Sequence, residues 1–190
     1  MLARQASFRR AAEVVTAELA MVPEVRAITL FGSVARPLER EVPRFQPFRH
    51  HRIEVLHECK DIDLAVWIDR FDHLAALNRA RSRAVADLFR DAGIGVAHHQ
   101  VEIFLFGQGW HDYRGRLCTF GQCPKGKVEC LTPGCGRELF LKQHAGFVLA
   151  PDAVAAGILL YKRGNPDDRS AVDAMRPDPP GRTSDTASAK

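Results

Sequence analysis

The sequence predicts an α/β domain with a mixed sheet, and three observations support this. Strand-like apolar stretches occupy residues 26–31, 61–68 and 100–106. Two longer stretches, 8–21 and 73–90, instead repeat their apolar residues with helical spacing. Hydrophobic residues make up 46% of the 190 residues, which suffices for the core of one ordinary domain. Strands that alternate with helices indicate a sheet flanked by those helices.

Each helical stretch has one apolar face. The face of the first consists of Phe8, Ala11, Ala12, Val15 and Leu19. The face of the second consists of Leu74, Leu77, Val85, Leu88 and Phe89. Pro23 and Gly93 follow the two stretches and favour helix ends there. Three arginines of the second helix lie roughly opposite its apolar face and are expected to be solvated: Arg79, Arg83 and Arg90.

The strand-like stretches are separated by clear breaks. Residues 26–31 form a short apolar run that ends at Gly32, after which a short helix is expected, limited by Pro37. Residues 61–68 alternate acidic and apolar side chains before they become fully apolar. Residues 107–117 are predicted to be a loop.

The rest of the chain divides into a closing unit, an insertion and a tail. A short helix at 152–158 and a strand at 157–161 are expected to complete a folded domain over residues 1–163. Residues 37–58 contain three prolines and many charges. Residues 164–190 contain no Leu, Ile, Phe, Tyr or Trp, so we expect a disordered tail.

Acidic residues mark two of the predicted strands. Asp61 and Asp63 are two residues apart, so a strand places both carboxylates on one face. Two close carboxylates repel each other unless a cation lies between them, and magnesium commonly binds through such pairs. Glu102 adds a third carboxylate on another strand, which would converge with the pair if the strands are neighbours. Two ions held there could activate an attacking hydroxyl and neutralise a leaving pyrophosphate.

A Gly-Ser turn precedes the acidic strand. Gly32 allows a phosphate to approach backbone N–H groups closely, and Ser33 adds a hydroxyl. The start of a helix at this point also favours an anion. A phosphate cradle combined with metal-binding carboxylates indicates phosphoryl or nucleotidyl transfer.

Three motifs carry a family resemblance: LFGSVAR at 30–36, KDIDLAV at 60–66 and VEIFLF at 101–106. In this order they resemble the nucleotidyltransferase superfamily of DNA polymerase β, especially its minimal members. The closing AAGILLYKRG is similar to the end of minimal members, where a helix leads into a short apolar strand. The resemblance covers roughly residues 8–106 and 151–163.

The resemblance implies a role for each of these polar residues. Gly32 and Ser33 would hold the triphosphate, Asp61 and Asp63 would bind the metals, and Glu102 would be the third acid. The interval between Ser33 and Asp61 is longer than is usual in the family, so residues 37–58 look like an insertion near the active-site mouth. This insertion is either a substrate-specific flap or the mark of a divergent member.

The expected activity is transfer of a nucleoside monophosphate from a nucleoside triphosphate such as ATP to a hydroxyl acceptor. That acceptor is a protein, an RNA or a small molecule. The alternative is a binding module of the same fold with weak or no catalysis, which binds RNA or protein or acts like an antitoxin. Minimal members of the family often work beside a helical protein partner, which makes such a partner an expectation here. Magnesium-dependent binding of the triphosphate separates the two hypotheses.

Four cysteines with the spacing C-x4-C-x6-C-x4-C form a second candidate site: Cys118, Cys123, Cys130 and Cys135. Four thiolates complete the shell of a structural zinc ion, so residues 117–140 are predicted to be a zinc-ribbon-like module. The alternative is four reduced cysteines in a Gly-rich loop. His111 and His144 flank the cluster and could replace one cysteine. The basic residues of the module fit either RNA binding or a solvated surface.

Charge and hydropathy indicate where the protein is located and which class of substrate suits it. The formal net charge of +4 fits an anionic substrate, although only weakly. No apolar run approaches membrane-spanning length, and no apolar signal core follows the N-terminal basic residues. We therefore expect a soluble, cytoplasmic protein without membrane contact.

Overall fold

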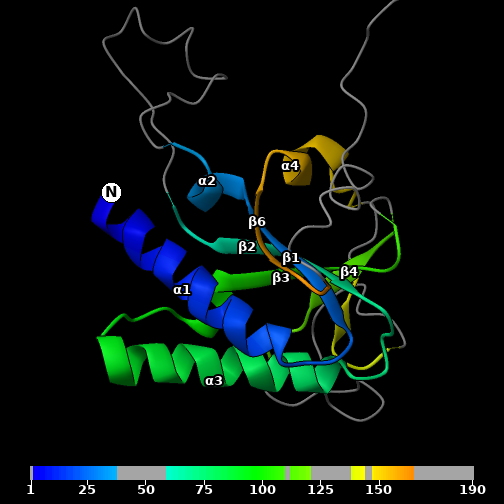
Figure 1. Ribbon diagram of the computed structural model, residues 1–190, viewed down its shortest axis with the longest axis horizontal. Helices are drawn as coiled ribbons and strands as arrows, with labels where there is room; N and C mark the ends of the chain where they lie inside the picture. The colour runs from blue at the N-terminus through cyan, green and yellow to red at the C-terminus, as the bar shows by residue number, and fades with distance from the viewer. Residues whose placement is uncertain (1, 38–58, 110–111, 121–137, 144–146, 165–190) are drawn as a thin grey trace, which may run out of the picture.

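The structure is a computed structural model that describes residues 2–37, 59–109, 112–120, 138–143 and 147–164. These residues build a six-stranded mixed sheet flanked by helices (Figure 1). The strands are β1 (Val25–Phe31), β2 (Ile62–Ile68), β3 (Val101–Phe106), β4 (Tyr113–Leu117), β5 (Leu141–Lys142) and β6 (Ile158–Lys162). The helices are α1 (Leu2–Ala20), α2 (Gly32–Ala35), α3 (Leu74–Ala92) and α4 (Pro151–Ala155), with a 3-10 turn η2 at His98–Gln100.

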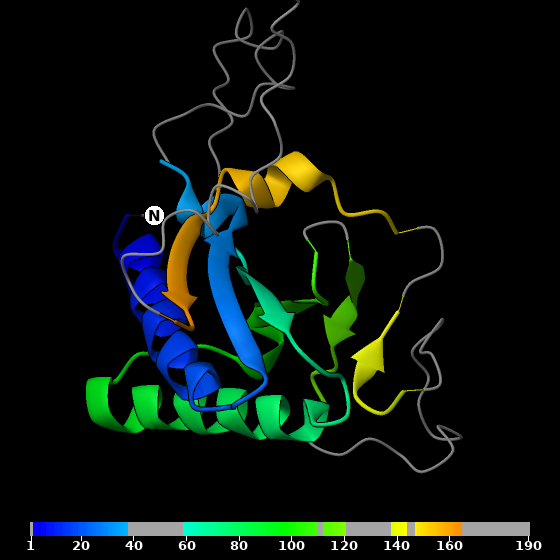
Figure 2. The same ribbon diagram turned by 45° about the vertical axis from the view of Figure 1, so that its right-hand side comes forward.

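The strands lie in the order β5-β4-β3-β2-β1-β6. β2 and β3 run parallel, and the other neighbouring pairs are antiparallel. α1 and α3 cover one face of the sheet, and the short α4 lies over the opposite face (Figures 1 and 2). The predicted mixed α/β architecture is therefore confirmed. None of the helices in the described part of the chain is long and apolar enough to cross a membrane.

The period of two along the strands separates two apolar clusters. In β2, Ile62, Leu64 and Val66 point into the main core, which α1 and α3 cover. Ala65 and Trp67 point to the opposite face, where they pack with aromatic side chains of β1 and β3 and with Val154 of α4. Because Asp63 and Glu102 have the parity of this second face, their side chains lie on the side of the sheet away from α1 and α3.

The predicted faces of the two long helices are confirmed with one exception. All five residues of the α1 face are buried, and so are Leu74, Leu77, Val85 and Leu88 of α3. The prediction that Phe89 belongs to the buried face is wrong, because its side chain is 67% exposed. The core-facing stripe of α3 runs through Arg81 and Ala84 instead, so Phe89 falls on its flank. Gly93 ends α3 with φ 63°, as its position predicted.

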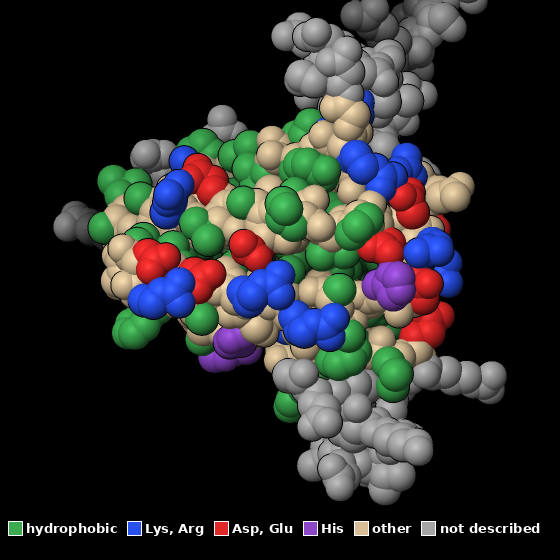
Figure 3. Space-filling view, turned by 60° about the horizontal axis from the view of Figure 1, so that its bottom comes forward, with side chains coloured by type: hydrophobic (Ala, Val, Ile, Leu, Met, Phe, Trp, Pro, Cys, Tyr) green, Lys and Arg blue, Asp and Glu red, His purple; other side chains and the backbone are tan. Residues whose placement is uncertain are grey.

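The outward face of α1 and α3 carries interspersed acidic and basic side chains (Figure 3). Arg83 pairs with Glu18 across the two helices at 3.3 Å, and Arg90 pairs with Asp87 at 2.7 Å. All these side chains are largely or partly exposed. Arg79 is exposed as well, so the expectation that the three arginines are solvated is confirmed, and this face resembles an ordinary solvated surface.

The loop predicted at 107–117 is wrong, because its second half forms strand β4. The sequence of this strand contains two arginines and a glycine, which gives little local preference for a strand. Long-range pairing decides the outcome, since β4 pairs with β3 on one side and β5 on the other. A Cβ on Gly115 would lie 2.8 Å from the backbone oxygen of Lys142, so only glycine allows β5 to approach this closely.

Several predictions concern residues outside the described ranges. These are residues 38–58 of the predicted insertion 37–58, residues 121–137 of the cysteine module 117–140 with Cys123, Cys130 and Cys135, the histidines His111 and His144, and residues 165–190 of the tail 164–190. Cys118 is described, and it is a buried free cysteine just after β4.

A fully buried arginine, which sequence reasoning missed, connects α3 to the segment that begins at Cys118. The Arg81 side chain is 0% exposed. It donates hydrogen bonds to the Cys118 carbonyl at 2.8 Å, to the Val101 carbonyl at 3.5 Å and to the Asn78 side chain. Asn78 in turn donates to the Phe120 carbonyl at 2.6 Å. Burial lowers the pKa of Arg81 to about 10, so the guanidinium stays charged at neutral pH.

Replacing Arg81 by Met is expected to destabilise the protein by about 3 kcal/mol, because it leaves buried carbonyl groups without their donor. Urea unfolding followed by circular dichroism measures the change. Arg79→Met on the exposed side of the same helix is the matched control and should change stability by less than about 0.5 kcal/mol. Equal stability of the two variants would contradict the structural role assigned to Arg81.

Candidate active site

The predicted acidic residues meet at one edge of the sheet. β1 ends there, and the parallel strands β2 and β3 both begin there. The register places Phe31 opposite Asp63 on one side and Glu102 beside Asp63 on the other. The condition set by the sequence, that the two acidic strands are neighbours, is therefore met. Asp61 lies just before β2 at the same edge.

The carboxylate of Asp63 lies against the backbone of the Gly-Ser turn. A Cβ built on Gly32 would be 2.2 Å from Asp63 Oδ2, and Gly32 has φ 72°. Both the space and the backbone conformation therefore require glycine at this position. The turn and the acidic strand, 31 positions apart in the chain, thus form one local structure.

Side chains of α1 hold the Gly-Ser turn in place. Gln5 is buried, and its amide Nε2 donates to the carbonyls of Val34 at 3.2 Å and Arg36 at 2.6 Å. Arg9 Nε donates to the Val34 carbonyl at 3.0 Å. These donors satisfy carbonyls at the end of α2, which is only four residues long. Because so short a helix has little dipole, an anion at this point would depend on direct hydrogen bonds from the turn and from the Ser33 hydroxyl.

The pKa of Asp63 is shifted by its burial and by the other charged groups at this edge of the sheet. Its pKa is raised from 3.8 to about 6, mainly by burial and then by the nearby carboxylates of Glu102 and Asp61. The positive charge of Arg116 opposes this increase in the pKa. The Asp63 carboxyl is therefore close enough to each of the other two acids to be repelled by it, and a bound cation would relieve that repulsion. The ligand atoms of all three acids do not lie within 4.8 Å of one another, so metal binding would draw them closer together.

Aromatic side chains line the sheet face next to these acids. Phe31 and Phe104 meet edge to face with ring centroids 5.0 Å apart. Trp67 stacks on Phe106 at 4.9 Å. This apolar surface keeps water away from the base of the acidic cluster, which is consistent with burial as the largest cause of the raised pKa of Asp63.

Arg116 is a site residue that sequence reasoning missed. Its position on β4, opposite Phe104 of β3, places it on the same sheet face as Glu102. Its Nη1 donates to Glu102 Oε2 at 2.6 Å. Its guanidinium carbon lies 4.7 Å from the ring centroid of Phe104 and 4.8 Å from that of Phe147. The alternation of Tyr113, Gly115 and Leu117 with two arginines was the only local signal for this strand.

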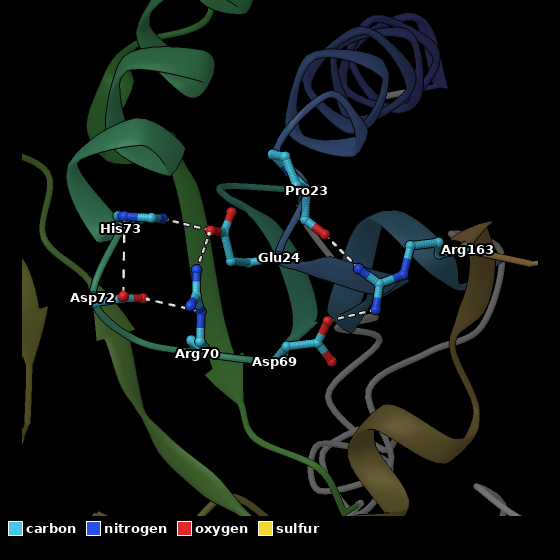
Figure 4. Close-up of polar contacts among 7 residues, drawn as sticks. All are labelled: Pro23, Glu24, Asp69, Arg70, Asp72, His73 and Arg163. Atoms are coloured by element: carbon cyan, nitrogen blue, oxygen red, sulfur yellow. Dashed lines mark hydrogen bonds and ion pairs between the residues drawn. The ribbon is translucent and has the colours of Figure 1, made fainter.

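A second polar cluster lies at the opposite edge of the sheet (Figure 4). Ligand atoms of Glu24, Asp72 and His73 lie within 4.8 Å of one another, a spacing that could hold a metal ion. The Glu24 carboxylate already has its own partners, because Arg70 donates to it at 3.3 Å and the His73 ring bonds to the same carboxylate oxygen. We therefore interpret it as an ion-pair cluster that joins the start of β1 to the turn after β2.

The Glu24 cluster is expected to make the free energy of unfolding depend on pH in the acidic range. The hydrogen bond from His73, with smaller contributions from the backbone of Glu24 and then from Arg70, lowers the pKa of Glu24 below 4.5 against the effect of burial. Because the folded-state pKa is depressed, this stabilisation is complete above 4.5 and is lost as the pH falls through the lower folded value. Glu24→Gln should therefore cost about 1–2 kcal/mol at pH 6, and this cost should shrink as the pH is lowered towards 3.

Urea unfolding of parent and Glu24→Gln at the two pH values measures this dependence. The control is Glu13→Gln, since the Glu13 side chain is 57% exposed and pairs with Arg10 on the surface of α1. A Glu24→Gln cost that stays constant from pH 6 to pH 3 would show that the charge of this carboxylate does not contribute.

No model of a known protein family, no curated protein and no solved structure matches the chain. The fold and the site define a mixed α+β protein with a six-stranded sheet and an acidic cluster at one sheet edge. Any more specific assignment rests on the chemistry of that edge.

Proposed function

We propose that this protein is a magnesium-dependent nucleotidyltransferase that transfers a nucleoside monophosphate from a nucleoside triphosphate to a hydroxyl acceptor. The observation that carries the proposal is the contact of Asp63 with the Gly32 turn on one side and its pairing with Glu102 on the other. A glycine turn next to carboxylates that repel one another suits a ligand that combines phosphate with a divalent cation.

The residues of this edge fit magnesium by their chemistry, since all candidate ligands are carboxylate oxygens. Asp61 and Asp63 would hold the ion or ions, with Glu102 as the third acid. Magnesium supplies charge neutralisation of the phosphates and activation of the attacking hydroxyl. The Gly32 turn and Ser33 hold the pyrophosphate end, so that it leaves as the acceptor oxygen bonds to the α-phosphorus. The acceptor proton passes to Glu102 or to water.

The alternative, a binding module of the same fold without catalysis, is favoured by one observation. Arg116 already engages Glu102 at 2.6 Å, which leaves this acid less available to a metal or a proton. Such a module would bind RNA or a helical protein partner without needing magnesium.

Equilibrium binding of a fluorescent ATP analogue with and without magnesium tests the proposal directly. We expect binding that requires magnesium and that improves as the pH rises through 6, because Asp63 must lose its proton to hold the ion. Labelled triphosphates incubated with candidate acceptors then test transfer. A parent protein that neither binds the triphosphate with magnesium nor transfers it would favour the binding module.

Zinc remains a second proposed cofactor. Purified protein is expected to contain about one zinc ion per chain, bound by Cys118, Cys123, Cys130 and Cys135. Elemental analysis of protein prepared without chelator measures this. Cys130→Ser should lower the zinc content and the melting temperature, because metal binding there contributes to local folding. Metal-free protein of unchanged stability would reject the zinc site.

A further inference from the structure

Four successive strands each contribute one element of the candidate active site. Gly32 follows β1, Asp63 is on β2, Glu102 on β3 and Arg116 on β4, and these strands are neighbours in that order. Neighbouring strands are about 4.8 Å apart, so the guanidinium lies within roughly 10 Å of the Asp63 strand. Consistent with this distance, the charge of Arg116 acts on the carboxyl of Asp63.

The guanidinium of Arg116 is held in a fixed orientation. It lies against the rings of Phe104 and Phe147, whose centroids are 6.4 Å apart. Arginine held on aromatic rings has lost most of its side-chain freedom before any ligand arrives, so little further entropy is lost on binding. Its Nη1 donates to Glu102, while its Nε is buried and has no hydrogen-bond partner among the described residues, so a ligand would be bound through the terminal Nη groups. The side chain is still 21% exposed, so a ligand can reach it.

The Glu102–Arg116 pair sets up a competition. A carboxylate can bind either a guanidinium or a metal ion strongly, and a guanidinium binds either a carboxylate or a phosphate. When magnesium attracts the Glu102 carboxylate, Arg116 loses its acidic partner in a site that then contains phosphate. A planar fork of donors is the group that suits phosphate oxygens best.

We propose that Arg116 is a phosphate-binding residue of this site. Its guanidinium donates to Glu102 until magnesium and the nucleotide bind, and then donates to the phosphates instead. The inference rests on the proposed function, because it assumes that the phosphates of a nucleotide occupy the edge formed by Gly32, Asp63 and Glu102. It adds a cationic residue to a site in which the sequence identified acids and a turn alone.

The first experiment compares magnesium-dependent binding of ATP and of inorganic triphosphate to the full chain. Arg116→Gln should weaken both ligands by about 10- to 100-fold, the range of one charge-assisted hydrogen bond. Arg116→Lys should recover part of the affinity. The control is Arg114→Gln on the same strand, since Arg114 is exposed, pairs with Asp112 and lies over Phe71. The control should bind both ligands like the parent.

The second experiment removes the competitor. Without magnesium, Glu102→Gln should bind inorganic triphosphate more tightly than the parent, because Arg116 is released and one negative charge is removed. Adding Arg116→Gln to that variant should abolish the gain. A merely structural Arg116 would not produce this reversal, and melting temperatures of all variants identify any that fail to fold.

The outcomes separate the two proposals. If the parent binds the triphosphate with magnesium and Arg116→Gln binds it equally well, Arg116 is not a phosphate ligand while the proposed function stands. If the parent shows no magnesium-dependent binding, the proposed function fails, and a missing gain in Glu102→Gln then overturns the role of Arg116 as well.

Discussion

Asp63→Asn is expected to reduce nucleotide transfer by about 1,000-fold or more. The magnesium ion that neutralises the reacting phosphate would lose a protein ligand, and this raises the activation barrier by several kcal/mol. Magnesium-dependent binding of the triphosphate should weaken in parallel. The measurement is transfer from a labelled triphosphate, with Asp87→Asn as the control. Asp87 pairs with Arg90 on the outward surface of α3, which covers the other face of the sheet from the acids, so its variant should retain full activity. Transfer by Asp63→Asn at the rate of the parent would refute the assignment of the site.

The same variant should not lose stability at neutral pH. The pKa of Asp63 is raised from 3.8 to about 6, so its ionised form is disfavoured in the folded state. The parent therefore loses stability as the pH rises from 3.8 to about 6, and Asn at this position escapes that loss. We expect Asp63→Asn to be as stable as the parent near pH 4 and more stable at pH 8 without magnesium. Urea unfolding at the two pH values measures the difference.

Gly32→Ala is expected to abolish magnesium-dependent nucleotide binding, with a loss of at least about 100-fold in affinity. The new Cβ would lie 2.2 Å from Asp63 Oδ2 and 3.1 Å from Asp63 Cγ, so the carboxylate must move away from the turn. The left-handed backbone conformation adds a cost of about 1 kcal/mol to the folded state. Binding of a fluorescent ATP analogue and urea unfolding measure the two effects separately.

The chain offers a matched control for this substitution. Gly93 has nearly the same backbone conformation, φ 63° against 72°, but a Cβ there would meet nothing within 4 Å. Gly93→Ala should therefore show the same loss of about 1 kcal/mol in stability and bind the nucleotide like the parent. Nucleotide binding by Gly32→Ala at the affinity of Gly93→Ala would show that the position of the Asp63 carboxylate does not matter for the ligand.

Local patterns predicted most elements of the fold. The face of α1 could be predicted because a helix repeats every 3.6 residues, and the two faces of β2 because a strand repeats every two. These periods come from the geometry of the backbone within one element and need no knowledge of its neighbours. Phe89 shows the limit of the method, since it has helical spacing from Val85 and is still exposed. The exposure of Phe89 depends on how far the neighbouring elements extend over α3.

Strand β4 and the two arginines show what local patterns miss. Arg114-Gly115-Arg116 has little preference for a strand, and its structure depends on pairing with β3 and β5. Arg81 is charged and lies in an amphipathic helix, where charge normally indicates solvent. It is buried because carbonyls of distant segments accept its hydrogen bonds.

The sequence by itself determined the two long helices, the three central strands and the glycine that begins the turn, because each depends on residues within a few positions of one another. The predicted shared strand face of Asp61 and Asp63 stays a prediction, since β2 begins only at Ile62. Tertiary structure decided that Glu102 lies beside Asp63, that the Asp63 carboxylate lies against Gly32, and that Arg116 faces Glu102. The physical reason is that strand order and register arise from pairing between segments far apart in the chain. A residue of either strand alone contains no information on which residue will be its neighbour.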